Sequence, residues 1–266
     1  MPCSSSPGPN VSNWDRELEV AAAAAKAAGE LAQSYQRGIE VETKSDLSPV
    51  THADRECEQL IASMLMKAFP GDGLLGEEGA RRDSTNGRKW IVDPIDGTRD
   101  YVRGNPLWAT LIGLEVDGQI AAGVASLPAL GGMYTASRGG GAFRNGERIR
   151  ASSKTTPADA VLCFNGFNKI NSFPFKSSLV DWMQSFWAVR SMGGAPDAML
   201  IASGQADAWI EPTAAPWDLA PLKVIIEEAG GVFFNLDGGD SIYGGNCIAC
   251  APGLEAELRR FVGLGG

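Results

Sequence analysis

Two aspartates separated by Pro94 and Ile95 stand at the end of an apolar run, in the stretch W-I-V-D-P-I-D-G-T. Pro94 fixes its own φ and disfavours helix at Asp93, so a buried strand should end there and a turn should begin at once. Asp93 and Asp96 can then converge at the edge of a sheet. Two close carboxylates repel, and one takes up a proton unless a cation lies between them. Mg²⁺, a hard cation that prefers oxygen ligands, would relieve that repulsion.

An acidic turn without a metal is the alternative interpretation, because Asp and Gly often cap the segment after a turn. Other acidic residues favour the metal. Glu77 and Glu78 follow an apolar pair in L-L-G-E-E-G, and Asp218 opens a helix-like segment in P-W-D-L-A. By itself Asp218 could be an ordinary helix N-cap. Carboxylates at three separate strand or helix ends indicate a cage for several metal ions.

The composition limits the classes of partner. The chain has 266 residues, 44% hydrophobic and 21% charged, which suits one large globular domain or two packed lobes. Lys and Arg number 23 against 32 Asp and Glu, for a net charge of −9. This charge counts against a general nucleic-acid or anionic-membrane binder, and no apolar run approaches the roughly 20 residues of a membrane span. An anionic small-molecule substrate would need metal ions to bind.

The five cysteines are scattered and odd in number, which fits a reducing, cytoplasmic location better than a disulfide framework. Cys247 and Cys250 have metal-knuckle spacing, but the sequence has no second such pair, and its one histidine, His52, is distant. We therefore interpret N-C-I-A-C-A-P as a short buried strand. Residues 1–11 have neither the basic region nor the apolar core of an export signal, and we expect a disordered lead there.

The remaining chain predicts a layered α/β fold. An alanine-rich helix is expected from Ser12 to about Arg37, and a second, amphipathic helix ends before Pro70-Gly71. Short apolar runs between residues 73 and 149, with hairpin signals at Asp117-Gly118 and Asn145-Gly146, predict a largely antiparallel sheet.

Beyond residue 150, strand-like and helix-like runs alternate, as in an α/β layer. The result is two sheets with helix layers between and outside them. We expect one unit over residues 12–264, with an α+β N-terminal lobe at 12–150 that holds the metal site and an α/β C-terminal lobe at 151–264.

Three motifs resemble the signatures of the inositol monophosphatase superfamily of Mg²⁺-dependent, lithium-sensitive phosphatases. They are G-E-E at 76–78, W-I-V-D-P-I-D-G-T at 90–98, and W-D-L-A at 217–220 followed by E-A-G-G at 228–231. The resemblance covers nearly the whole chain after the first dozen residues, and the motifs occur in the family's order. It implies an αβαβα sandwich and hydrolysis of a phosphate monoester.

The resemblance also implies two to three Mg²⁺ ions per site. Glu77, Asp93 and the carbonyl of Ile95 would hold one ion. Asp93, Asp96 and Asp218 would hold a second, and a third, weaker ion would rest on Glu77 and waters.

The same resemblance implies roles around the phosphate. Asp54 would accept a hydrogen bond from the Thr98 hydroxyl, and the Gly97 and Thr98 N–H groups would contact the phosphate, where glycine permits close approach. One Mg²⁺ would lower the pKa of a bound water that Glu77 and Thr98 orient for in-line attack, and a second would steady the leaving oxygen. Glu77, Thr98 and Asp54 are therefore the expected catalytic residues.

Within the superfamily, the sequence most resembles the histidinol-phosphate phosphatases of histidine biosynthesis. Arg99 after D-P-I-D-G-T and the segment G-N-P-L-W-A-T-L-I-G-L carry this resemblance. Glu211 matches the family position that contacts the alcohol part of the substrate. Gly194 and Ala195 stand where inositol enzymes more often have a hydroxyl residue nearby, which puts recognition of inositol in doubt.

The substrate's own chemistry agrees with this choice. Histidinol phosphate carries a cationic amine and an imidazole, so its pocket should offer carboxylates and aromatic faces. Trp209 lies two residues before Glu211, and Asp197 is another candidate contact.

Several alternatives stay open. Glu211 also fits inositol hydroxyls, Arg99 could be an exposed arginine without a role, and Glu78 could be solvated. His52 is interpreted as a surface or outer residue, because the metal mechanism needs no imidazole. The rival functions are an inositol or sugar phosphatase, a nucleotide 3′-phosphatase, a non-catalytic regulator on the same fold, and an acidic interaction protein.

The resemblance implies a homodimer, since the family is commonly dimeric. The hairpin formed by T-L-I-G-L-E-V and Q-I-A-A-G-V-A-S could contribute to its interface.

Overall fold

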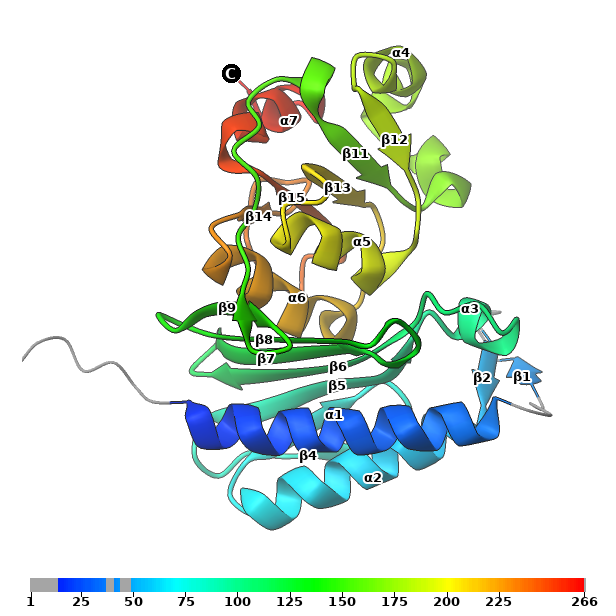
Figure 1. Cartoon of the computed structure of the whole chain (residues 1–266), viewed down its shortest axis with the longest axis vertical. Coiled ribbons are helices and arrows are strands. Elements are labelled where there is room, and N and C mark those ends of the chain that lie inside the picture. Colours follow the sequence, from blue (N-terminus) through cyan, green and yellow to red (C-terminus); the bar gives the residue numbers. More distant parts are fainter. Residues whose placement is uncertain (1–13, 37–40, 44–48, 266) are drawn as a thin grey trace, which may run out of the picture.

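Helices and sheets alternate in five layers, seen edge-on in Figure 1. The structure is a computed structural model that describes residues 14–36, 41–43 and 49–265. The first layer holds α1 (Asp15–Tyr35) and α2 (His52–Ala68), and the third holds α5 (Gly194–Ala202) and α6 (Pro216–Glu228). The last layer includes α4 (Leu179–Met183) and α7 (Glu255–Phe261). The sheets lie between these layers, which confirms the predicted αβαβα sandwich.

The two helices of the first layer pack on one face of the larger sheet. A stripe of small side chains lets α1 approach α2 and β7 (Gln119–Leu127) closely; the buried members are Ala21, Ala24, Ala25, Ala28 and Ala32. The predicted start at Ser12 and end at Arg37 lie outside the described residues, as does the expected lead. The described helix has Trp14 at its N-cap, without a side-chain cap. α2 ends at Ala68, before Pro70, as predicted.

The larger sheet has the order β10-β9-β8-β7-β6-β5-β3-β4. Its other strands are β3 (Gly73–Gly76), β4 (Arg81–Arg82), β5 (Arg88–Asp96), β6 (Ala109–Val116), β8 (Gly132–Ser137), β9 (Gly141–Arg144) and β10 (Glu147–Arg148). All neighbours are antiparallel except β3 and β5. Left-handed backbone at Asp117-Gly118 and Asn145-Gly146, with φ of 51° and 79° and of 51° and 83°, closes both predicted hairpins.

One expected boundary is wrong. Strand β5 does not end at Asp93; it continues to Asp96, which pairs with Ala109 after a shift of register. The irregularity falls at Pro94-Ile95, where proline has no N–H to donate and a bulge tolerates its absence. Both aspartates therefore belong to one strand.

The smaller sheet has the order β12-β11-β13-β15-β14. Its strands are β11 (Val161–Phe164), β12 (Ala188–Arg190), β13 (Ala208–Glu211), β14 (Val232–Phe234) and β15 (Cys247–Cys250). β11 runs parallel to β12 and β13, whereas β15 is antiparallel to both of its neighbours. Cys247 packs toward the middle helices and Cys250 toward the outer ones, so the two thiols lie on opposite faces, as expected of a buried strand.

The strands of the hairpin expected at an interface lie in the centre of the molecule. β6 and β7 are flanked by other strands, with α1 on one face and α6 on the other, whereas their turn at Asp117, Gly118 and Gln119 is exposed, so a contribution of this hairpin to an interface stays a prediction. Along the described chain, no helix is both long and apolar enough to cross a membrane. The division into lobes at residue 150 stays a prediction.

Helix α6 rests directly on β6 and β7 because glycines lie beneath it. A Cβ at Gly113 would lie 2.7 Å from Ala220 Cβ, and a Cβ at Gly123 would lie 2.7 Å from Pro221 Cα. The missing side chains let the helix backbone approach the sheet. This contact fixes the height at which the first turn of α6, with Asp218, sits over β5.

Replacing Gly123 with alanine should destabilise the protein. The new Cβ meets backbone atoms of Pro221, which cannot rotate away, and overpacking of this kind costs about 1–3 kcal/mol. Urea unfolding measures the loss. Gly71→Ala is the control, because its Cβ would meet only side-chain atoms of Asn86 and Thr85. Equal stability of the two variants would contradict the proposed close packing.

Candidate active site

Carboxylates from three elements converge between the larger sheet and the middle helices. Oxygen atoms of Asp93, Asp96 and Asp218 all lie within 4.8 Å of one another. Glu77 directly follows β3, whose parallel register places Gly76 beside Val92. The Glu77 N–H donates to the Val92 carbonyl at 3.1 Å, which brings this residue alongside Asp93.

Each aspartate of the cluster also accepts a backbone hydrogen bond. Asp93 Oδ1 accepts from the Ile95 N–H at 3.0 Å, and Asp96 Oδ2 accepts from Ala195 at 2.9 Å. Asp218 Oδ2 accepts from the Ala215 N–H at 2.8 Å, so this aspartate does cap α6. Both interpretations of Asp218 hold, because the same carboxylate also belongs to the cluster.

The electrostatics of the cluster suit a cation. Burial raises the pKa of Asp93 well above its ordinary value, and the nearby carboxylates of Glu77, Asp96 and Asp218 raise it further. Burial likewise raises the pKa of Asp96 to about 6 and that of Asp218 to about 7. A divalent cation would relieve this repulsion, and an all-oxygen set of ligands suits Mg²⁺. The predicted acidic metal site therefore fits these residues.

Asp54 lies at the start of α2 and is fully buried. Its Oδ2 accepts hydrogen bonds from the N–H and the hydroxyl of Thr51, at 2.7 and 2.6 Å. The Thr98 hydroxyl lies 3.4 Å from Asp54 Oδ1 and 3.2 Å from the Ile95 carbonyl, so two acceptors are available to its one proton. The expected contact between Asp54 and Thr98 is thus present, at the long end of the hydrogen-bond range.

The chain turns sharply between β5 and the short helix α3 (Thr98–Val102). Gly97 makes this turn with a left-handed φ of 85°, and a Cβ there would lie 2.9 Å from the Leu107 carbonyl. Glycine is required by both features. The backbone of Gly97 and Thr98 therefore directly follows Asp96, at the start of a helix, where N–H groups lack intrahelical acceptors.

A cavity of about 140 Å³ opens beside Asp96 and Asp218 and brings together residues expected at the alcohol end of a substrate. Its lining is Asp96, Gly194, Ala195, Trp209, Glu211, Thr213, Ala214, Asp218, Leu219 and Leu222. Burial raises the pKa of Glu211 to about 8, although a 2.9 Å hydrogen bond from Asn165 Nδ2 favours its charged form. Arg99 is exposed on α3 and does not line this cavity.

Asp197 does not make the expected contact. It is fully buried, and its carboxylate accepts the N–H groups of Met192 at 3.1 Å and Gly193 at 3.2 Å. It holds the loop that leads into α5 instead of facing the cavity. His52 is a surface residue, as interpreted: its side chain is 66% exposed and lies 3.2 Å from Glu56.

Two buried polar residues beside the site carried no signal in the sequence. Asn165, which holds Glu211, looks like any polar residue after a strand, although its Oδ1 also accepts the Ser191 hydroxyl at 2.9 Å. Glu58 looks like any helix glutamate, yet its carboxylate accepts N–H groups from the loop that carries Glu77. Its position four residues after Asp54, and so on the same face of α2, was the one feature of the sequence that could have indicated that Glu58 faces the site.

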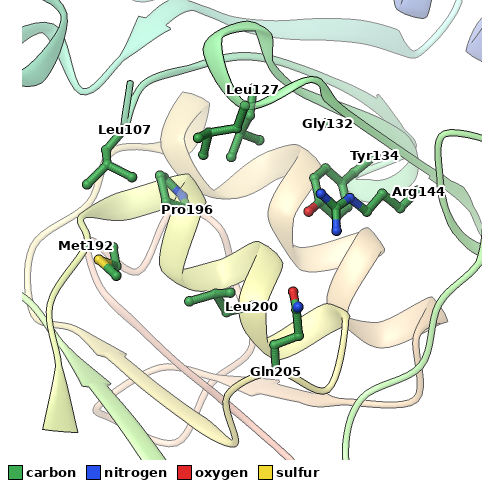
Figure 2. Close-up of a pocket in the computed structure, with 10 residues that line it drawn as sticks. Leu107, Leu127, Gly132, Tyr134, Arg144, Met192, Pro196, Leu200 and Gln205 are labelled. Atoms are coloured by element: carbon green, nitrogen blue, oxygen red, sulfur yellow. The ribbon is translucent and has the colours of Figure 1, made fainter. Parts of the chain in front are cut away.

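A separate cavity of about 230 Å³ lies between α5 and the β8–β9 side of the sheet, and Figure 2 shows its mainly apolar lining. Its one charged side chain, Arg144, lies over the ring of Tyr134, with 5.5 Å from the guanidinium carbon to the ring centre. None of the residues expected at the catalytic site lines this cavity.

Comparison with known proteins agrees with the geometry. The chain matches the description "Inositol monophosphatase family" over residues 13–261. It is 39% identical to a histidinol-phosphatase of Chlorobaculum parvum, over 88% of this chain and 92% of that protein. It is 37% identical to an inositol-1-monophosphatase of Mesorhizobium japonicum, over 90% and 93% of the two chains.

The fold is similarly close to a solved structure. The extragenic suppressor protein suhB from Bartonella henselae superposes with a TM-score of 0.86 and 31% identity. The superposition covers 95% of this chain and all of that one. The layered sandwich is thus shared across nearly the whole length.

Without metal, the protein should lose stability as the pH rises from 5 to 8. The raised pKa values of Asp96, Asp218 and Glu211, about 6, 7 and 8, mean that the folded state holds protons that the unfolded chain releases near pH 4. The contribution of these three groups to stability is therefore complete below about pH 4 and is lost as the pH rises through their folded pKa values. Thermal unfolding in EDTA should show a falling Tm over this range.

Mg²⁺ should reverse this loss, because it binds the charged carboxylates of the folded state. At matched ionic strength, millimolar Mg²⁺ should raise Tm more at pH 8 than at pH 5. A metal-free Tm that stays constant, or an Mg²⁺ effect that is larger at pH 5, would contradict the cluster's electrostatics.

Proposed function

The chain belongs to the inositol monophosphatase family and is one of its phosphomonoesterases, and from this premise we propose that its substrate is histidinol phosphate. Hydrolysis would yield histidinol and inorganic phosphate. The observation that carries the proposal is the acidic cavity beside the cluster. Asp96, Glu211 and Asp218 line it, and its described lining includes no lysine or arginine. With Asp96 and Asp218 bound to metal, Glu211 would supply the negative charge of this cavity, which would favour the cationic amine of histidinol over a neutral polyol.

The name of the histidinol-phosphatase relative supports the same choice. The inositol-1-monophosphatase is nearly as similar, so an inositol phosphate is the alternative substrate. Its hydroxyl groups could donate hydrogen bonds to Glu211, but they carry no positive charge to pair with the carboxylate.

We propose that two to three Mg²⁺ ions bind at the cluster. The ligands would be Glu77, Asp93, the Ile95 carbonyl, Asp96 and Asp218. When bound, Mg²⁺ would neutralise phosphate charge, lower the pKa of water and stabilise the leaving oxygen. The net charge of −9 would then be no obstacle to an anionic substrate.

The protein's own groups would position the phosphate end. Thr98 and Glu77 would orient the attacking water, and Asp54 would fix the rotation of the Thr98 hydroxyl by accepting its hydrogen bond. The N–H groups of Gly97 and Thr98 would bind phosphate oxygens. These roles follow from the family resemblance and agree with the hydrogen bonds of Asp54.

At the alcohol end, Glu211 would accept a hydrogen bond from the ammonium or imidazole N–H. Asn165 would hold the carboxylate, since its amide donates to one oxygen and leaves the other for the substrate. Gly194 leaves space beside Asp96, because a Cβ there would lie 2.8 Å from Asp96 Oδ2. Ala195, also in the lining, would add a small apolar surface. A substrate contact by Arg99, a cytoplasmic location and a homodimer stay predictions.

Phosphate release from a panel of esters tests the substrate. Histidinol phosphate, inositol 1-phosphate, fructose 1,6-bisphosphate and adenosine 3′,5′-bisphosphate should each be assayed with Mg²⁺ and with EDTA. We expect histidinol phosphate to have a kcat/KM at least tenfold above the others, equivalent to about 1.4 kcal/mol. Comparable rates on inositol 1-phosphate would overturn the substrate assignment, and no release from any ester would favour the non-catalytic regulator.

Glu211→Gln should discriminate between the two ends of the site. Removing the negative charge should lower kcat/KM for histidinol phosphate about tenfold or more, because an ion pair with the ammonium becomes a weaker hydrogen bond to a neutral amide oxygen. Hydrolysis of p-nitrophenyl phosphate, which has no cationic group, should change less than threefold. Glu147→Gln, an exposed change of the same kind on β10, is the control. Equal losses on both substrates would contradict a role in recognising the amine.

A further inference from the structure

Glu58 is a buried carboxylate next to the site, with a relative exposure of 3%. It lies on α2, one turn after Asp54. Its Oε2 accepts the Glu78 N–H at 2.7 Å, and its Oε1 accepts the Ala80 N–H at 2.7 Å. One side chain therefore binds the turn that follows Glu77 at two points.

The turn is shaped around this carboxylate. A Cβ at Gly76 would lie only 2.2 Å from Glu58 Oε2, so glycine leaves the space that the carboxylate fills. The turn also closes on itself, since the Gly76 N–H donates to the Ala80 carbonyl at 2.8 Å. Gly79 completes it with a φ of 109°, which favours glycine.

Glu77 is thus fixed from both sides. Its own N–H donates to Val92 at 3.1 Å, and the N–H of the next residue donates to Glu58. Burying a carboxylate is unfavourable unless its oxygens are hydrogen-bonded, and short bonds to a carboxylate are among the stronger ones. A methionine or leucine would fill the same volume on α2, so packing alone does not require a glutamate.

We infer that Glu58 is a positioning residue for the metal site. It holds the turn over residues 77–80 so that the Glu77 carboxylate faces Asp93. The inference rests on the proposed function in one respect, that Glu77 is a metal ligand. Asp54 and Glu58, four residues apart on one face of α2, then support the Thr98 side and the Glu77 side of the site from a single helix.

Glu58→Gln separates the hydrogen bonds from the volume of the side chain. The amide has the same shape but a single acceptor oxygen, and its NH₂ group would face a backbone N–H. Of the two bonds to the turn, one is lost and replaced by two opposed donors. Glu56→Gln, the same change at a half-buried position of α2, is the matched control, because the partners of Glu56 are the Tyr35 hydroxyl at 3.1 Å and His52 at 3.2 Å rather than the turn.

Two measurements on the intact chain test the inference without relying on activity. Hydrogen exchange of the metal-free protein should be at least tenfold faster at the amides of residues 78 and 80 in Glu58→Gln. Calorimetry should show an Mg²⁺ dissociation constant at least fivefold higher. Glu56→Gln should change neither. A folded Glu58→Gln protein with wild-type exchange and wild-type Mg²⁺ affinity would overturn the inference.

A second variant covers the case in which Glu58→Gln does not fold. Glu58→Asp keeps the charge but shortens the side chain, so we expect exchange and Mg²⁺ affinity between those of the wild type and the values expected for glutamine. Unchanged values in that variant would again overturn the inference. The substrate proposal can fail separately. If the wild type binds Mg²⁺, and Glu58→Gln lowers that affinity, but the wild type releases no phosphate from histidinol phosphate, the proposed substrate is wrong and the positioning role of Glu58 still holds.

Discussion

Repulsion between buried carboxylates is the constraint on which the site depends. Asp93, Asp96 and Asp218 would separate in a flexible chain, because Asp96 and Asp218 both disfavour the ionised form of Asp93, and Asp96 disfavours that of Asp218. A backbone N–H holds each one: Ile95 beside the first, Ala195 at the start of α5 beside the second, and Ala215 before α6 beside the third. Three different segments must therefore be in place to hold the carboxylates together against their repulsion. The rest of the fold positions these segments.

The layer order explains why the site lies where it does. β3 and β5 are the parallel pair in an otherwise antiparallel sheet, so their carboxyl ends meet at the same edge and bring Glu77 beside Asp93. α6 descends onto that sheet over Gly113 and Gly123 and brings Asp218. The site thus forms where the larger sheet meets the middle helices, and a shift of either layer would separate the carboxylates.

The sequence predicts those features that depend on neighbouring residues. The turns at Asp117-Gly118 and Asn145-Gly146 follow from local backbone preferences, and the acidic motifs predict the carboxylate cluster. The bulge that carries β5 on to Asp96 was not predictable, because pairing with Ala109 decides it. Asn165, Asp197 and Glu58 were missed or misplaced for one reason. Their partners are backbone N–H groups or side chains that only the folded chain brings near, and a polar residue's type does not reveal a distant partner.

Under the proposed function, metal and substrate binding would reinforce each other. Cations at the cluster would neutralise Asp96 and Asp218. Glu211 would then be the carboxylate in the cavity lining that is not bound to metal. The same cations would remove two of the negative neighbours that help to raise the pKa of Glu211, so its ionised form would become more favourable. Glu211 would then be a better partner for an ammonium group in the metal-loaded enzyme than in the metal-free one. Selectivity for a cationic alcohol would in this way depend on the same ions that take part in the phosphate chemistry.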